Sequence, residues 1–352
     1  MNTFTKRSLA VILCVILSVG LAACGGGGAP APAAPAPAPA PGGAAPAAPA
    51  APDVNFPTST IELIVPWGAG GSLDNMARGI QRFFNIDGHT LVVTNMAGAS
   101  GAIGTMEGVH SRPDGYRIML TGIQSILSYS MAYVYDMVID DLIPIATMGY
   151  DQRVIAVNAD SDFQTLDDVI AFARANPGEL TWGGSGARGF NEMLSRQVWA
   201  ALDIDVIWVP FEGGAAARTA GLGGHIDVTF LSSSELLGVV SGGEMRALAL
   251  CMPERSDHYP GVPTLTELGY AFSGALWGGV FAPGDTPEEI VNIIGAELRR
   301  VFEDPEFYET VHQTGWEMLF MDRQETLEYI ANERVFMADL FELMTGNRPT
   351  RT

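Results

Sequence analysis

Short hydrophobic segments alternate with glycine-rich and polar segments along the chain from about residue 58 onward. A run of apolar or β-branched residues between turn-forming residues is typical of a buried strand. Segments of this kind span residues 61–65, 90–94, 116–121, 180–182, 205–209, 226–231 and 245–250. Several are followed by a glycine-rich loop and then by a helical pattern. This order predicts an α/β fold in which mostly parallel sheets are covered by helices.

Apolar residues three or four positions apart predict the helices. Asp74 is expected to cap a helix whose buried face holds Met76, Ala77, Ile80 and Phe84. Two further helices are predicted. In the first, Ile103, Met106 and Val109 are spaced by three, and the second is a long helix over residues 323–344.

Capping signals mark two more helices. Thr165 and Asp168 have the spacing of a capping box, and residues 176–178, Asn-Pro-Gly, are expected to end that helix. Thr286 is expected to cap a helix with proline in its first turn, ending near Phe302.

The first 57 residues have a different composition. Lys6 and Arg7 precede an apolar run over residues 8–19, which is shorter than the roughly 20 residues that span a bilayer. The pattern is typical of a secretory signal peptide, here residues 1–23. Its end, Leu-Ala-Ala-Cys, resembles the lipobox of bacterial lipoproteins, in which Cys24 is acylated. The alternatives are an ordinary signal peptide with a chance cysteine, or an uncleaved anchor.

Residues 25–57 are almost entirely Gly, Ala and Pro. Such a segment lacks the side chains for a core, and Pro-Ala repeats favour extended polyproline II. At about 3.1 Å per residue it could reach roughly 100 Å. We therefore expect a lipidated spacer over residues 24–57.

The charge of the mature chain limits its partners. After Lys6 and Arg7 are set aside, 17 Arg and no Lys face 40 Asp and Glu, a formal net charge of −23. Nucleic acid and anionic membrane surfaces are thus unfavourable partners. Beyond Cys14 in the signal and Cys24, only Cys251 remains, most simply a buried thiol. An internal disulfide in the folded part is excluded.

An anionic ligand remains compatible with this charge. Ligands of open α/β sheets bind at the carboxyl ends of strands, where helix N-termini present free N–H groups. Several glycine-rich loops at such positions could bind an anion without any lysine.

Sequence motifs for catalysis or metal binding are missing. Neither Ser100 nor Ser185 has the Gly-x-Ser-x-Gly pattern of a hydrolase nucleophile, and no histidine pair or calcium loop has metal-binding spacing. Leu73 interrupts a dinucleotide-binding pattern. We therefore expect no enzymatic activity, no cofactor and no metal.

The loops resemble those of one family, the tripartite tricarboxylate transporter receptors, also called the Bug family. Residues 64–74, IVPWGAGGSLD, are similar to its opening VVPFPPGGGTD, and residues 209–214, VPFEGG, are similar to VPYKGG. Further similar segments follow in the family's order, and the resemblance extends from about residue 60 to 345. They are residues 93–104, 113–116, 176–180, 183–186, 223–228, 246–249, 254–256 and 260–264.

The resemblance implies a two-lobed periplasmic-binding-protein fold, type II-like, that closes on its ligand as a Venus flytrap does. It implies a small carboxylate ligand, such as a di- or tricarboxylate, an amino acid or an aromatic acid. It also implies delivery to a membrane permease of one large and one small subunit. We expect a monomer, outside the cytoplasm, with a first lobe over 58–154, a second over 155–248 and a return to the first over 249–352.

Loop by loop, the resemblance places the ligand between backbone groups of both lobes. The first-lobe residues that it implies are Trp67, Gly68, Ala69, Gly70, Gly71, Ser72, Ser100, Gly101, Ala102, Thr121 and Gly122. The second-lobe residues are Ser185, Gly186, Ala187, Arg188, Gly189, Phe211, Gly213, Gly214 and Ser232. For each glycine, simple turn geometry is the alternative.

Some residues depart from the family's pattern. Met96 stands where Arg is usual, Glu212 where Lys is common, and residues 232–234 are serines where an Asp is frequent. Arg188 could pair with a ligand carboxylate or with Glu212, or lie in solvent.

Three aromatic side chains near the loops allow two interpretations. Trp67, Trp182 and Phe190 could stack on an aromatic ligand, or could belong to the core.

Two other functions stay open from the sequence. The chain could be a sensor that reports ligand binding to a signalling partner, or an exported hydrolase with a nucleophile that no motif reveals.

Overall fold

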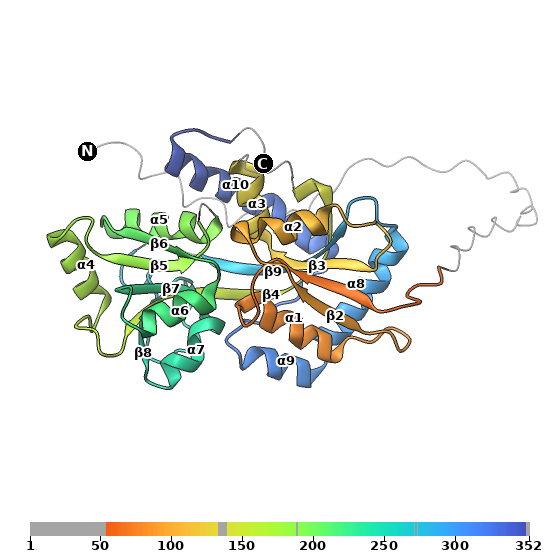
Figure 1. Ribbon diagram of the computed structural model, residues 1–352, viewed down its shortest axis with the longest axis horizontal. Coiled ribbons are helices and arrows are strands. Elements are labelled where there is room, and N and C mark those ends of the chain that lie inside the picture. The colour runs from red at the N-terminus through yellow and green to blue at the C-terminus, as the bar shows by residue number, and fades with distance from the viewer. Residues whose placement is uncertain (1–53, 133–138, 188, 271, 273, 350–352) are drawn as a thin grey trace, which may run out of the picture. The chain divides into compact units, whose positions relative to one another are not determined.

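The hydrogen-bonded sheet runs in the order β2-β1-β3-β9-β4-β7-β5-β6, with β8 paired to β4 (Figure 1). The structure is a computed structural model, and it describes residues 54–132, 139–187, 189–270, 272 and 274–349. Within these residues the strands are β1 Ile61–Val65, β2 Leu91–Asn95, β3 Arg117–Gly122, β4 Leu142–Asn158, β5 Thr181–Ser185, β6 Ile207–Phe211, β7 Val228–Ser232, β8 Met245–Leu250 and β9 Ala275–Pro283.

Helices cover both faces of this sheet (Figure 1). They are α1 Ser72–Phe83, α2 Ala102–Val109, α3 Ile123–Ala132, α4 Leu166–Ala175, α5 Phe190–Leu202, α6 Gly214–Leu222, α7 Ser233–Ser241, α8 Glu288–Phe302, α9 Pro305–His312 and α10 Arg323–Thr345. Two short 3₁₀ helices span Ala99–Gly101 and Ile139–Asp141. Among the described residues, no helix is both long enough and apolar enough to cross a membrane.

Parallel pairing holds within two groups of strands. The first is β1 with β2 and β3, and the second is β5 with β6 and β7. We call the part built on β1, β2, β3 and β9 the first lobe, and the part built on β5, β6, β7 and β8 the second lobe.

The 17-residue strand β4 passes from one lobe to the other. Its residues 142–152 pair antiparallel with β9, and residues 153–158 pair antiparallel with β7 and β8. The sheet is therefore mixed, because every pair that includes β4 or β9 is antiparallel. The exact lobe boundaries predicted from the sequence stay a prediction.

Glycine and polar residues hid these two strands in the sequence. Gly278 in β9 packs under an indole, because a Cβ there would lie 2.9 Å from the ring of Trp316. Gly149 in β4 has φ +142°, and a Cβ there would lie 2.5 Å from the carbonyl oxygen of Glu317. Both glycines permit a close approach rather than mark a turn.

Most predicted elements are confirmed, and two predicted helix caps are wrong. The N-cap of α1 is Gly71, and Asp74 instead accepts a hydrogen bond from the N–H of Gly70 at 2.8 Å. The N-cap of α8 is Pro287, while the hydroxyl of Thr286 donates to the carbonyl of Pro283. The predicted helix with Ile103, Met106 and Val109 is confirmed as α2, in which Val109 packs against the core and Ile103 is 58% exposed.

The predicted capping box of α4 and the buried face of α1 are confirmed. Thr165 accepts from the N–H of Asp168, whose carboxylate accepts from the N–H of Thr165. Met76, Ala77, Ile80 and Phe84 are at most 2% exposed.

The folded part begins slightly before the predicted spacer ends. Phe56 is buried and its ring centroid lies 5.1 Å from that of Tyr116. The predicted signal peptide, Cys24 and the spacer up to residue 53 lie outside the described residues.

Candidate functional site

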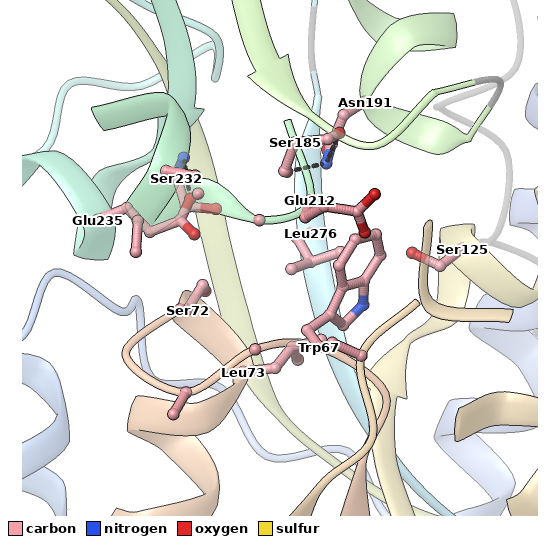
Figure 2. Close-up of a pocket in the computed structure, with 18 of the residues that line it drawn as sticks. Trp67, Ser72, Leu73, Ser125, Ser185, Asn191, Glu212, Ser232, Glu235 and Leu276 are labelled. Carbon is pink, nitrogen blue, oxygen red and sulfur yellow. Dashed lines mark hydrogen bonds between the residues drawn. The ribbon is translucent and has the colours of Figure 1, made fainter. Parts of the chain in front are cut away.

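A cavity of about 230 Å³ lies at the carboxyl ends of β1, β5, β6 and β7. This is the edge of an α/β sheet at which ligands bind. The volume is below the 300–1,000 Å³ of pockets for drug-sized molecules, so it suits a small ligand. The cavity is lined by Trp67, Gly68, Ala69, Gly71, Ser72, Leu73, Ala97, Ser125, Arg153, Ser185, Asn191, Glu212, Gly213, Gly214, Ala215, Ala216, Ser232, Glu235 and Leu276. Figure 2 shows Trp67 and Ser72 of the first lobe facing Ser185 and Ser232 of the second.

Helix N-termini from both lobes converge on this cavity. Residues 71–73 line it from the start of α1, and residues 213–216 line it from the start of α6. Ser232 and Glu235 line it from the start of α7. The first turn of a helix has N–H groups without intrahelical partners and a partial positive charge. The cavity thus offers three such ends to an anion.

Arg153 places a guanidinium in the cavity wall. It is 2% exposed and extends from β4 opposite Ser232 of β7. Nη1 donates to the hydroxyl of Ser232 and Nη2 to the Oδ1 of Asn191, both at 2.5 Å. Asn191 is itself fixed, because its Nδ2 donates to the hydroxyl of Ser185 at 2.6 Å and to the Ser185 carbonyl at 3.0 Å.

These contacts fix the orientation of the guanidinium but leave part of it without partners. Two of the five guanidinium N–H groups donate to Ser232 and Asn191. Its buried Nε has no hydrogen-bond partner among the described residues. Burial lowers the pKa of Arg153, and the nearby carboxylates of Glu235 and Asp151 oppose that shift. A buried cation in this position gains from an anionic ligand.

Asp151 connects the two sides of the cavity from below. Its side chain is fully buried and accepts hydrogen bonds from the hydroxyls of Ser72 and Ser234 and, at 3.2 Å, from the Ser234 N–H. Burial raises the pKa of Asp151 to about 7, although the bonds from Ser234 and Ser72 favour its charged form. Near neutral pH this carboxyl is therefore partly protonated, which reduces negative charge behind the cavity.

Glu235 brings an acidic group to the same place. Its Oε2 accepts from the N–H of Ser232 at 3.1 Å, at the start of its own helix. A Cβ on Gly214 would lie 1.8 Å from its Oε1, and a Cβ on Gly71 would lie 3.6 Å away. The glycine loops of both lobes therefore pack closely around this carboxylate.

Comparison with known proteins identifies the family. A family profile described as the tripartite tricarboxylate transporter family receptor matches residues 76–342. The chain belongs to this family. The resemblance inferred from the loop motifs is thereby confirmed, and the protein is a solute-binding receptor for a transporter.

Relatives and solved structures agree with this assignment. The protein BugT of Bordetella pertussis strain Tohama I is 31% identical over 296 residues, which are 82% of this chain and 89% of BugT. The structure of the periplasmic binding protein BugD has a TM-score of 0.76 at 25% identity, covering 82% of this chain and 98% of BugD. The structure of MatC from Rhodopseudomonas palustris, solved with bound malate, has a TM-score of 0.74 at 21% identity, covering 81% of this chain and 99% of MatC. The two-lobed periplasmic-binding-protein fold is confirmed.

In this receptor the cavity contains nine of the residues that the family resemblance implied. They are Trp67, Gly68, Ala69, Gly71, Ser72, Ser185, Gly213, Gly214 and Ser232. Their contact with ligand stays a prediction. Arg188 lies outside the described residues.

The other implied residues lie elsewhere around the receptor's loops. These are Gly70, Ser100, Gly101, Ala102, Thr121, Gly122, Gly186, Ala187, Gly189 and Phe211, none of which lines the described cavity. Ser100 instead joins the loops of the two lobes directly. Its hydroxyl donates to the carbonyl of Ala187 and accepts from the Ala187 N–H, both at 2.9 Å.

The aromatic residues separate into two kinds. Trp67 lines the receptor's cavity, whereas Trp182 is fully buried against Trp199 and Phe230, and Phe190 is 3% exposed. Trp182 and Phe190 are core residues, so only Trp67 of these three is placed to touch a ligand.

The resemblance did not indicate three polar side chains that line the cavity of this receptor. Arg153, Asn191 and Glu235 lie outside the glycine loops, and Arg153 belongs to a strand that the hydrophobic pattern did not reveal. A lone arginine between Gln152 and Val154, beside an apolar run, was the available signal.

Proposed function

We propose that this receptor binds a small carboxylate in the cavity and delivers it to a membrane permease of one large and one small subunit. The observation that best supports the carboxylate is the buried guanidinium of Arg153, oriented by Ser232 and Asn191, beside three helix N-termini. Each of these groups stabilises negative charge.

One ligand carboxylate would lie between Arg153 and the starts of α6 and α7. The start of α1, with Gly71 and Ser72, would approach it from the first lobe. Ligand contacts made by both lobes stabilise the closed form relative to the open form, as closure on a ligand requires.

The acidic side chains limit the ligand's charge. Among the described residues that line the cavity, Glu212 and Glu235 are accompanied by one arginine, Arg153. A second ligand carboxylate near Glu212 would be repelled, so we propose that a mono- or short dicarboxylate binds better than a tricarboxylate. The ligand is released chemically unchanged, since the chain acts as a receptor and not as an enzyme.

A thermal-shift screen tests the carboxylate. Mono-, di- and tricarboxylates, with the matching amides as neutral controls, are added to the purified full chain. A ligand at 100 times its Kd should stabilise the folded state by about 2.7 kcal/mol. Titration calorimetry then gives the affinity, and recovered ligand is checked for chemical change. Stabilisation by amides as strong as by acids would contradict a carboxylate ligand.

We further propose that the receptor acts as a lipid-anchored monomer outside the cytoplasm. The signal pattern, Cys24 and the Gly/Ala/Pro-rich spacer support this location. A tether raises the effective concentration of the receptor at its permease. Light scattering of the purified chain tests the monomer.

A further inference from the structure

Away from the ligand cavity, two histidines and a glutamate meet at one point. His258 lies in the loop after β8, His312 is the last residue of α9, and Glu317 follows α9. One ligand atom from each lies within 4.8 Å of the other two. The ring centroids of the two histidines are 4.4 Å apart.

Neighbouring groups orient these side chains as they do around metal ions. Nδ1 of His312 lies 3.1 Å from the carbonyl oxygen of Trp316, which can only accept, so Nδ1 carries a proton and Nε2 of the neutral ring has the lone pair. Oε1 of Glu317 accepts from the hydroxyl of Ser256 at 2.8 Å. Such outer hydrogen bonds fix the tautomer and direction of metal ligands.

His258 has a buried nitrogen without a partner. Its Nε2 has no hydrogen-bond partner among the described residues. A buried polar atom in that state costs free energy unless another group satisfies it. An ion between the three side chains would do so.

We propose that His258, His312 and Glu317 bind a divalent transition-metal ion of the zinc type. Two imidazoles and a carboxylate are the donor set that zinc accepts, at about 2.0–2.2 Å from the metal. Ligand atoms on one tetrahedral ion lie about 3.3 Å apart at those bond lengths. Small shifts of the three side chains that keep the bonds to Trp316 and Ser256 would bring the ligand atoms to this spacing.

Two of the three proposed ligands also line a second cavity. His312 and Glu317 line this space of about 420 Å³, together with the acidic residues Glu254 and Asp257. Water or one of these carboxylates would complete the tetrahedron. Arg255 also lines this space but pairs with Glu267 at 2.9 Å, so the acidic residues there still attract a cation.

The ion would link two parts of the chain that are distant in the sequence. The loop with His258 follows β8, whereas Glu317 is bonded to Tyr150 of β4 through both backbone groups, at 2.9 and 3.0 Å. Because His258 and His312 are 54 positions apart, the sequence contained no local metal motif.

Metal titration of the full chain tests the proposal. Free Zn²⁺ is titrated by calorimetry and free Co²⁺ by visible absorption. We expect one ion per chain, with a cobalt spectrum typical of nitrogen and oxygen ligands in a tetrahedral site. His258→Gln and His312→Gln should each weaken binding at least 100-fold, and Glu317→Gln about tenfold. His110→Gln, which changes an exposed histidine at the end of α2, is the matched control and should bind as the unchanged chain does.

The controls separate this site from the thiols of Cys14 and Cys24. Thiolate ligation adds intense near-ultraviolet absorption to the cobalt spectrum, whereas the proposed site does not. Circular dichroism checks that each variant folds, and if one does not, the cobalt spectrum of the unchanged chain decides. Absence of saturable one-to-one binding, or undiminished binding by both histidine variants, would overturn the proposal.

Discussion

At the scale of single residues, the cavity balances one buried cation against several acids. Arg153, Asp151 and Glu235 lie together behind loops made mainly of glycine, serine and alanine. Backbone N–H groups can bind many different anions, so these side chains are the best candidates for selecting one ligand over another. Substitutions of the arginine and of the acids around it test their separate effects.

Replacement of Arg153 by Gln should lower the affinity for a carboxylate about 10- to 100-fold. This range corresponds to the loss of charge-assisted hydrogen bonds, each contributing about 1.5–3 kcal/mol. Calorimetry measures the affinity. Stability is measured separately by urea unfolding, because loss of the buried Arg153 charge also leaves the negative charge of Glu235 without compensation. Arg246→Gln is the control, since Arg246 of β8 donates to backbone carbonyls of Phe163 and Ala159 away from the cavity. Unchanged affinity in a folded Arg153→Gln chain would exclude contact with the ligand.

Replacement of Glu212 by Gln should raise the affinity for a dicarboxylate. Two like charges a few ångströms apart repel by about 1 kcal/mol in water, so the expected gain is roughly three- to tenfold. The gain should shrink at high salt, which screens exposed charges. Glu179→Gln, at an exposed acid before β5, controls for the change in net charge. An equal gain in both variants would mean that long-range charge, and not the cavity, sets the effect.

Asp151 should make stability depend on pH. Its pKa is raised from 3.8 to about 7 in the folded chain, so the folded state holds a proton that the unfolded state releases between these values. The free energy of unfolding therefore falls as pH rises from about 4 to 7, by up to about 1.4 kcal/mol per pH unit, and levels off above. Asp151→Asn, which can still bridge Ser72 and Ser234, should remove this contribution.

Urea unfolding at pH 5, 6 and 8 measures that difference between the unchanged chain and the Asn variant. Asp160→Asn, at an exposed position after β4, should keep the pH dependence of the unchanged chain. If the free energy of unfolding depended on pH in the same way for the unchanged chain and for Asp151→Asn, Asp151 would be ionised in both the folded and the unfolded state.

At the scale of elements, sequence patterns predicted what is local and missed what is long-range. Strands β1, β8 and the capping box of α4 depend on neighbouring residues, and their bounds agree closely with the pattern. The polar residues Asp151, Gln152 and Arg153 lie where β4 changes partner from β9 to β7, and no short pattern encodes such a crossing.

The same division holds for the site. Loop motifs indicated the glycine-rich half of the cavity, since backbone recognition requires glycine at fixed places. They could not indicate Arg153, Asn191 or Glu235, which reach the cavity from separate elements. Tertiary packing, which no local motif encodes, brings these three side chains together.

The start of α6 offers a matched pair of glycines. A Cβ on Gly214 would lie 1.8 Å from Oε1 of Glu235, whereas a Cβ on Gly213 would meet nothing within 4 Å, with φ at an extended −178°. Gly214→Ala must displace Glu235 and break its bond to the Ser232 N–H. We expect a loss of about 1–3 kcal/mol in the free energy of unfolding for Gly214→Ala, and little change for Gly213→Ala. Urea unfolding compares them, and equal stability would mean that Glu235 moves without cost.

At the scale of the whole molecule, the proposed lipid attachment and the proposed ligand binding involve different parts of the chain. All the described residues that line the cavity lie from Trp67 onward, and the Gly/Ala/Pro-rich spacer has few side chains that could contribute to recognition. The proposed lipid on Cys24 should therefore affect where the receptor is and not what it binds.

Replacement of Cys24 by Ala tests that separation. The variant should leave the membrane fraction and keep the ligand affinity of the unchanged chain. Uptake should fall, because a released receptor loses the effective concentration that a tether provides at the permease. Cys251→Ala is the matched control: Cys251 is a buried thiol in the fold, so that variant should stay with the membrane. Retention of Cys24→Ala in the membrane would indicate an uncleaved anchor, and a loss of affinity would mean that the first residues take part in binding.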